Sequence, residues 1–445
     1  MKRVVLSSFI ALLIISAIAI AYFYYQQVKT PNAEALNAIP SDAAFILEVQ
    51  NTKSAWSKIE AKPIWKELVA LPFFKNISNT AHLLDSVLKA NKNDLLIESS
   101  TVFISGHMSA ADGYDLLFLL NLPKMQQDAF VTDIMEESLG SRYKIARENY
   151  NGITVHKVQM GNRTLSLAVC KGVFMASFSP ALIEDGISQL KVGRPVSYDR
   201  YFKQVLAASG TTVDASLFIN YKIFPKVLMS YLVSSDKNPS VATLNGLNSF
   251  SNWSGMDVKI NPDGLLLNGF STASDSSSFL HMFQNIPPQN MELLKMLPSK
   301  TAFLLYMGIE SGKTYFQKYE HYLKENKGIA AYHTRITEIN KTMDLDVQEE
   351  MAKWMGREMA VVITESGGED FKNHVYAVME SKNTDDAKSF FKKLSRGHSL
   401  KEIANKEEVY RDCPIGFLDV PNLMPDLFGS VFGKLDKMFY TIIDG

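Results

Sequence analysis

The chain has 445 residues and a net charge of −1, and 46% of its residues are apolar, 11% aromatic and 21% charged. This composition excludes a disordered, collagen-like or low-complexity chain, because it supplies enough apolar residues for packed cores. The balanced charge argues against a nucleic-acid partner, since nucleic-acid-binding proteins normally carry a basic excess. The only cysteines, Cys170 and Cys413, exclude a disulfide-framed miniprotein and a cysteine-based metal site.

Residues 1–29 are predicted to form an N-terminal transmembrane signal-anchor. Val4–Tyr25 contains no charged residue, and at ~1.5 Å per residue a helix of this length is about 33 Å long, enough for a hydrocarbon core of roughly 30 Å. Lys2 and Arg3 precede it, which predicts a cytoplasmic N-terminus. We therefore expect residues 4–25 to contact the inner membrane and the remainder to be periplasmic. A cleaved signal peptide is the alternative, because Ala19-Ile20-Ala21 offers a cleavage site.

Residues 30–287 are predicted to form a first α+β module of antiparallel meander strands, with helices packed on one face. Asn151-Gly152 and Lys171-Gly172 each separate two apolar strands, as in tight hairpins, and Asn261–Gly264 is a third turn. In chain order, the predicted strands are 43–49, 101–105, 115–122, 143–149, 153–159, 165–170, 173–177, 216–220, 255–260 and 265–271, and the predicted helices are 53–61, one beginning at Pro63, 125–139, 180–190 and 199–208.

A duplicated segment predicts that a second copy of this module occupies residues 288–445. Ile39–Val49 returns as Leu297–Met307, 258 residues later, with five of eleven positions identical. At the same offset Val102–Ile104 matches Ala360–Val362, which makes a chance match improbable. The second copy is predicted to contain a strand at 301–307 and helices at 315–326 and 332–355.

The second copy is expected to be incomplete. The segment 437–443 takes the place of the strand at 165–170, and Asp444-Gly445 takes the place of the Lys171-Gly172 turn. No second hairpin strand follows, and an unpaired apolar strand is prone to aggregation. We therefore expect the natural chain to continue; the alternative is that the second copy lacks half of the module.

Motifs that resemble catalytic or phosphate-binding sequences are weak. Gly308–Thr314 has three residues between its glycines, whereas a P-loop needs four, so it predicts a strand-to-helix turn. Ser86–Lys89 and Ser188–Lys191 have the serine–lysine spacing of penicillin-binding enzymes but lack the accompanying motifs of that class. We expect both pairs to be ordinary surface residues.

No catalytic, cofactor-binding or metal-binding residue can be assigned, and we expect no cofactor. The eight histidines never form a His-x-x-x-His pair, and the acidic pairs are adjacent in sequence and so diverge on a helix. Cys170 and Cys413 fall at positions that do not correspond between the two copies. Buried free thiols are the expected state.

The start of the chain resembles a domain-of-unknown-function family. The features that carry this resemblance are the Lys-Arg start, the single apolar segment, Ile39–Phe45 and the Pro63–Leu68 helix. The members that it resembles are membrane-anchored, repeat-containing envelope proteins of Gram-negative bacteria, often longer than this chain. The resemblance implies no activity and no site residue.

These observations predict a single-pass, membrane-anchored extracytoplasmic protein that acts as a non-catalytic binding or scaffolding module of the cell envelope. Its expected partner, besides the membrane, is an envelope protein or an apolar ligand. The alternatives are an apolar-ligand carrier, which would need a large apolar cavity, and a periplasmic hydrolase with scattered catalytic residues.

Overall fold

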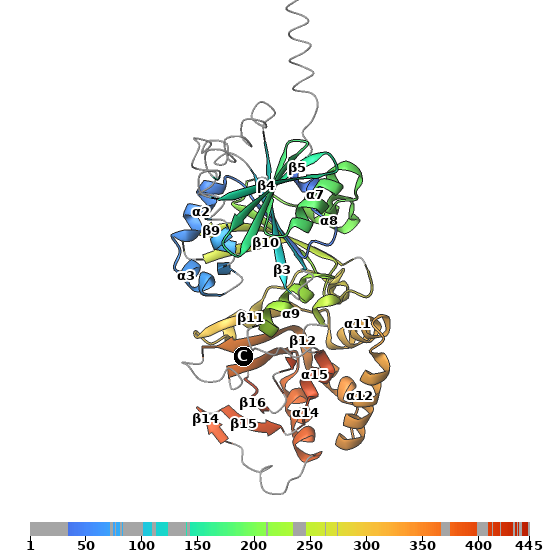
Figure 1. Ribbon diagram of the computed structural model, residues 1–445. Helices are drawn as coiled ribbons and strands as arrows, with labels where there is room; N and C mark the ends of the chain where they lie inside the picture. Colours follow the sequence, from blue (N-terminus) through green and yellow to red (C-terminus); the bar gives the residue numbers. More distant parts are fainter. Residues whose placement is uncertain are drawn as a thin grey trace, which may run out of the picture. The chain divides into compact units, whose positions relative to one another are not determined.

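The chain folds into two compact units in the computed structural model (Figure 1). The first unit comprises Met1–Asn238 and Asn252–Thr272, and the second comprises Pro239–Ser251 and Ala273–Gly445. The structure describes residues 34–71, 74–75, 77–80, 82, 101–108, 113–122, 139, 143–210, 212–234, 246–262, 264–273, 275–365, 374–397, 408–411, 413–418, 420–429, 432–433, 435 and 438–443.

The first unit is built on a ten-stranded antiparallel sheet in the order β10-β9-β8-β1-β2-β3-β7-β6-β5-β4. Neighbours in sequence are mostly neighbours in the sheet, but β7 lies between β3 and β6, and β1 lies between β2 and β8. The strands are β1 (Phe45–Val49), β2 (Val102–Met108), β3 (Tyr114–Asn121), β4 (Lys144–Tyr150), β5 (Ile153–Met160), β6 (Arg163–Cys170), β7 (Val173–Ser177), β8 (Ala215–Asn220), β9 (Trp253–Asn261) and β10 (Gly264–Thr272).

Two tight turns predicted from sequence are confirmed by their backbone angles. Asn151 and Gly152 have φ values of 51° and 78°, and Lys171 and Gly172 have 49° and 83°. Two successive left-handed residues make a type I′ turn, whose twist matches that of a two-residue hairpin. Strand β4 therefore pairs with β5, and β6 with β7, in the predicted antiparallel order.

The centre of this sheet is buried on both faces. Along β3, Leu117 and Leu119 belong to one apolar cluster, and Leu116, Phe118 and Leu120 belong to another on the opposite face. Successive side chains of a strand point to opposite faces. Strand β3 is therefore shielded from water on both sides.

Helices cover both faces, so the prediction that they pack on one face only is wrong. Ile183 and Phe202 pack on the Leu117 face, whereas Val227 packs on the opposite face with Phe118. The physical reason is that β3 and β7 are apolar in both alternating registers, so each face needs a cover. The helical segments of this unit are η1 (Ala35–Ala38), α2 (Thr52–Glu60), α3 (Pro63–Ala70), α7 (Pro180–Val192), η4 (Val196–Tyr198), α8 (Arg200–Ala207) and α9 (Phe224–Ser234).

The second unit contains two three-stranded antiparallel sheets, β11-β12-β13 and β14-β15-β16. A core rich in aromatic residues, including Tyr315, Tyr332, Trp354 and Phe428, joins its helices to these sheets. Its elements are η5 (Phe279–Phe283), η6 (Glu292–Met296), β11 (Thr301–Gly308), α11 (Gly312–Glu325), α12 (Ile329–Met343), α13 (Val347–Trp354), β12 (Met355–Thr364), β13 (Val375–Ser381), α14 (Thr384–Gly397), β14 (Glu408–Tyr410), β15 (Cys413–Leu418), α15 (Leu423–Phe428) and β16 (Met438–Tyr440).

The single helix predicted over 332–355 is two helices, α12 and α13. Asp344 ends α12 with a left-handed φ of 52°. Asp346 then caps α13, because its side chain accepts a hydrogen bond from the Glu349 N–H at 3.0 Å. Aspartate tolerates the left-handed conformation and is a strong N-cap, so this short segment stops one helix and starts the next.

The chain is α+β with antiparallel sheets, but the predicted transmembrane helix is not supported. No helix among the described residues is long and apolar enough to cross a membrane. Residues 4–25, to which the sequence assigned that helix, lie outside the described residues, as do the Ser86–Lys89 pair and all but the last residue of the helix predicted at 125–139. The fold is therefore described from residue 34 onward.

The position of β3 predicts the cost of truncating its side chains. Leu117 is 0% exposed. Leu117→Ala should therefore lower the free energy of the unfolding that exposes the β3 amides to exchange by about 2–5 kcal/mol, through lost burial and a residual cavity. Leu266→Ala, on the exposed edge strand β10, is the matched control and should change it by less than about 0.5 kcal/mol. Amide hydrogen exchange along β3 and β7 measures both values. Equal effects of the two substitutions would contradict this placement of the core.

Candidate functional site

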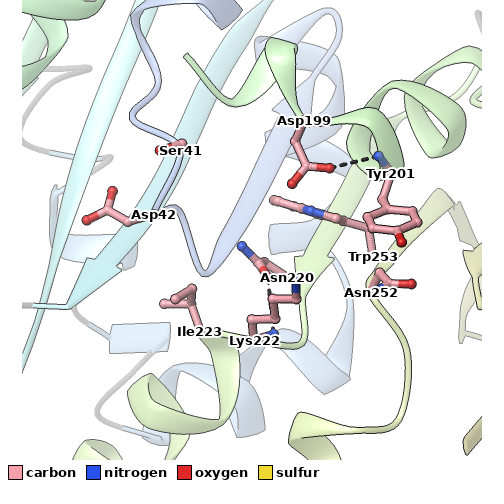
Figure 2. Close-up of a pocket in the computed structure, with 9 residues that line it drawn as sticks. All are labelled: Ser41, Asp42, Asp199, Tyr201, Asn220, Lys222, Ile223, Asn252 and Trp253. Carbon is pink, nitrogen blue, oxygen red and sulfur yellow. Dashed lines mark hydrogen bonds between the residues drawn. The ribbon is translucent and has the colours of Figure 1, made fainter. Parts of the chain in front are cut away.

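A cavity of about 230 Å³ lies in the first unit, where three strands end beside the start of α8 (Figure 2). Strand β8 runs antiparallel to both β1 and β9, so its C-terminal end lies beside the N-terminal ends of its two neighbours. Loops leaving these ends bring polar side chains to one place. The lining residues are Ser41, Asp42, Asp199, Tyr201, Asn220, Lys222, Ile223, Asn252 and Trp253.

Asn220 fixes the loops around the floor of the cavity. Its Nδ2 donates a hydrogen bond to the Ala43 carbonyl at 3.1 Å, and its Oδ1 accepts one from the Lys222 N–H at 3.1 Å. Both ends of this buried amide are therefore used within the protein. The amide ties the segment before β1 to the turn after β8 and holds the backbone of Lys222 in place.

Asp199 is positioned by its role as the N-cap of α8. Its Oδ1 accepts hydrogen bonds from the N–H groups of Tyr201 at 2.7 Å and Phe202 at 3.1 Å, the first of which is drawn in Figure 2. An aspartate at this position satisfies amides that the helix leaves unpaired. The same contacts hold the carboxylate and the Tyr201 ring at the wall of the cavity.

Asn252 lines the cavity and also carries an unpaired acceptor that is buried away from it. The residue is 6% exposed, and its side-chain Oδ1 is buried without a hydrogen-bond partner among the described residues. Its backbone is satisfied, because its N–H donates to the Thr272 carbonyl at 3.0 Å. Buried polar atoms are nearly always paired, and an unpaired one costs about 1–3 kcal/mol.

Asp42 connects the rim of the cavity to a buried row of polar groups. Asp42 Oδ1 lies 3.1 Å from His107 Nδ1, and His107 Nε2 lies 2.9 Å from Ser105 Oγ. Since a carboxylate only accepts, Nδ1–H is the donor in the first contact. The hydrogen bond from His107 lowers the pKa of Asp42 below its ordinary value, against the opposing effect of desolvation.

The row Ser105–His107–Asp42 has the residue types of a serine-hydrolase triad, but its serine is inaccessible to solvent. Ser105 and His107 are each 0% exposed and lie within β2, while Asp42 is at the surface. A catalytic serine must reach a substrate carbonyl, with its base beside it. In this row the accessible end is the carboxylate, so the arrangement anchors Asp42 and does not attack a substrate.

Sequence reasoning missed the cavity and this row. Ser105 and His107 alternate on one strand and therefore share a face, which was the only local signal for their contact. Asp42 is far away in sequence and meets them only through the pairing of β1 with β2.

The other motifs singled out from sequence have structural roles. Gly308 ends β11, and Ser311 caps α11 by accepting a hydrogen bond from the Thr314 N–H at 3.1 Å, which confirms the predicted strand-to-helix turn. Ser188 Oγ donates to the Glu184 carbonyl at 2.9 Å, and Lys191 Nζ donates to the Asn151 carbonyl. The two side chains of the Ser188–Lys191 pair therefore serve separate contacts.

The cysteines and histidines form no further site in the described part of the chain. Cys170 and Cys413 are free, as expected; Cys170 is buried, which raises the pKa of its thiol, and Cys413 is half-buried. No group of three or more histidine, cysteine, aspartate or glutamate residues is arranged to hold a metal ion within the described ranges.

A family described as "Protein of unknown function (DUF3352)" matches residues 124–406, more than half of the chain. The chain belongs to this family. No curated protein and no solved structure matches it. The DUF3352 match extends over both units and includes Asp199, Asn220 and Asn252, whereas Ser41 and Asp42 precede it. The cavity of this DUF3352 chain is thus built from the matched region and the segment that leads into β1.

The contact between Asp42 and His107 predicts a pH-dependent stability. A carboxyl whose pKa is lowered on folding stabilises the fold above its unfolded pKa of about 3.9, and loses this contribution as the pH falls through the folded value. Asp42→Asn should therefore be less stable than the wild type at pH 7, and the difference should shrink below about pH 4. Urea unfolding at several pH values measures it. In a His107→Gln background the same substitution should show little pH dependence, and an unchanged difference there would contradict the assignment to His107.

Proposed function

We propose that this DUF3352 chain is a non-catalytic binding module, and that the cavity of the first unit is its binding site. The observation that carries the proposal is a cavity of about 230 Å³ at which Asp42, Asp199 and Lys222, from three separate loops, lie beside the amide of Asn220. Small-molecule sites typically combine a concave surface with a few fixed polar groups.

The alternatives from sequence receive less support. An apolar-ligand carrier needs a large apolar cavity, but the apolar clusters on both faces of the sheet are filled by leucine and aromatic side chains. A second hollow, beside Met282 and Ile309, has a volume of only about 10 Å³, roughly the minimum for one water molecule. The hydrolase alternative is weakened by the sealed position of Ser105.

We also infer that the two meanders descend from a duplication, of which only the first copy carries the site. The pair Val102↔Leu120 in β2–β3 becomes Ala360↔Val378 in β12–β13 after a shift of 258 residues, which is the same register. After the same shift, the β11–β12 pairing differs from the β1–β2 pairing by one residue. A β-bulge between Thr301 and Phe303 lies beside this change of register.

The polar row of the first copy has no equivalent in the second. At the same offset Lys300 stands in place of Asp42, Ile363 in place of Ser105, and Glu365 in place of His107. The two copies thus share the pairing of two strands but differ in the residues at these three positions. This difference favours a small-molecule binding role for the first unit alone.

We further propose that both units act on the outer side of the cytoplasmic membrane, as part of the cell envelope. The support is the uncharged run at 4–25 preceded by Lys2 and Arg3, which has the charge and hydropathy pattern of an export signal. This proposal concerns only the side of the membrane on which the units lie.

Alkaline phosphatase fused after Gly445 tests the location, because this enzyme becomes active only after export. We expect activity from the fusion, and loss of that activity when three leucines within residues 4–25 are replaced by lysine. A matched fusion to a reporter that is active only in the cytoplasm should be silent. Activity of the cytoplasmic reporter alone would show that the proposed location is wrong.

The unpaired acceptor predicts an unusual substitution. Asn252→Leu removes a buried, unpaired polar group at similar volume, so the protein should become more stable by up to about 1–3 kcal/mol. Urea unfolding measures this effect. Asn268→Leu, on the exposed face of β10, is the control and should leave stability within about 0.5 kcal/mol. A clear loss of stability in Asn252→Leu would mean that the fold depends on this amide.

A further inference from the structure

The two sheets of the second unit repeat the strand order of the first unit, with one strand fewer among the described residues. In the first unit the order β1-β2-β3-β7-β6-β5-β4 runs without interruption. In the second unit β11-β12-β13 and β16-β15-β14 follow the same order, but no described strand joins β13 to β16. The comparison places an open position between β13 and β16, at the point that β7 holds in the first unit. This feature is separate from the cavity.

One apolar core supports both sheets of the second unit. Ala377 of β13, Leu418 of β15 and Tyr440 of β16 belong to a single cluster. Phe391 of α14 stacks on Tyr440 with ring centroids 4.4 Å apart, and Figure 1 draws β16 between β15 and β12. In the first unit, Phe174 of β7 belongs to the cluster that joins β3 to β5 and β6. The second unit therefore has a packed core on either side of the open position.

The two strands that border the open position are edge strands with exposed aromatic side chains. Tyr376 on β13 is 46% exposed, and Phe439 on β16 is 75% exposed. Their neighbours Ala377 and Tyr440 belong to the shared core, so Tyr376 and Phe439 lie on the opposite faces of their strands. An edge strand presents backbone donors and acceptors to which another strand can pair. A strand that enters here would meet apolar side chains on both of its faces.

Pairing on two sides distinguishes the open position from the other edges of the described sheets. Strands β4 and β10 of the first sheet and β11 of the second each offer one edge only. The β4 edge also carries Lys144, Arg147 and Glu148, and charges on an edge oppose the addition of a strand. A strand between β13 and β16 would gain backbone hydrogen bonds from both neighbours and would join two three-stranded sheets into one.

Strand β7 shows which chemistry fits such a position. All five of its residues, Val173–Ser177, are buried and uncharged, and the strand is antiparallel to both β3 and β6. Every described strand of this chain is already paired within a sheet, so neither this chain nor a second copy has a described strand to spare. We propose that the second unit binds an extended, uncharged apolar segment of a different protein by strand addition, antiparallel to both β13 and β16.

A synthetic peptide with the sequence of residues 171–177 is the probe, because it contains the whole of β7. Hydrogen–deuterium exchange of the full chain, read by mass spectrometry over residues 375–381 and 438–443, follows its binding. We expect exchange in both segments to slow about tenfold or more at saturation, because both edges gain backbone hydrogen bonds. The control peptide carries Met175→Pro, which removes a backbone donor and is not tolerated inside a sheet, so it should give no protection.

Two variants locate the bound peptide on the protein. Phe439→Lys and Tyr376→Lys change exposed side chains beside the open position, and each should weaken the peptide about fivefold through a lost cross-strand contact. Phe303→Lys, on the edge strand β11, is the matched control; Phe303 is 51% exposed, and its substitution should leave the affinity unchanged. Circular dichroism shows which variants are folded, and the two test variants lie in different sheets, so each checks the other.

Slower exchange in both segments, sensitive to Phe439→Lys and Tyr376→Lys, supports the proposal. Protection of one segment alone would show addition to a single edge and would overturn it, as would the absence of protection or equal protection by the proline peptide. Loss of affinity in Phe303→Lys alone would place the peptide on β11 instead. If the chain without peptide protects the same segments as its own concentration rises, the occupant is a second copy and the assignment to a different protein is wrong.

Discussion

Burial of the central strands on both faces is the constraint on which the rest of the first unit depends. The side chains of β3 alternate between two apolar clusters, so neither face can be left to water. The helical segments η1, α7 and α8 cover one face, and α9 contributes to the cover of the other. The polar groups that line the cavity lie at the ends of the strands and in the loops beside them. The cavity forms at the edge where β8 ends, β1 and β9 begin, and α8 starts.

Local features of this fold could be predicted from the sequence, whereas non-local ones could not. Asn151-Gly152 and Lys171-Gly172 specify their hairpins within two residues, because the glycine of each pair accepts a positive φ value readily. The insertion of β7 between β3 and β6 depends on which edge remains open after the hairpins form, and no residue pattern encodes it. The break between α12 and α13 depends on Asp344 and Asp346, in a segment whose apolar spacing still favours one helix.

The candidate site was not predictable for a related reason. Asn220 ends a predicted strand and Asn252 lies before another, and nothing in the sequence distinguishes their hydrogen-bonding states: the Asn220 amide is paired at its nitrogen and at its oxygen, whereas Asn252 keeps an unpaired oxygen. Asp42 and His107 are brought together by strand pairing alone. Their contact resembles a catalytic row by residue type, and only the burial of Ser105 distinguishes a support for the rim from a reaction centre.

The strand order also has a consequence for how the chain acquires its structure. Strand β1 needs two partners, β2 and β8, and β8 follows all of the strands from β2 to β7 in the sequence. During synthesis one edge of β1 must therefore wait, with its amides and carbonyls unpaired, until residues 215–220 have been made. Long-range pairing of this kind slows folding, and open edges expose a chain to misassembly. Because the cavity is bounded by β1, β8 and β9, it is among the last parts of the first unit to be assembled.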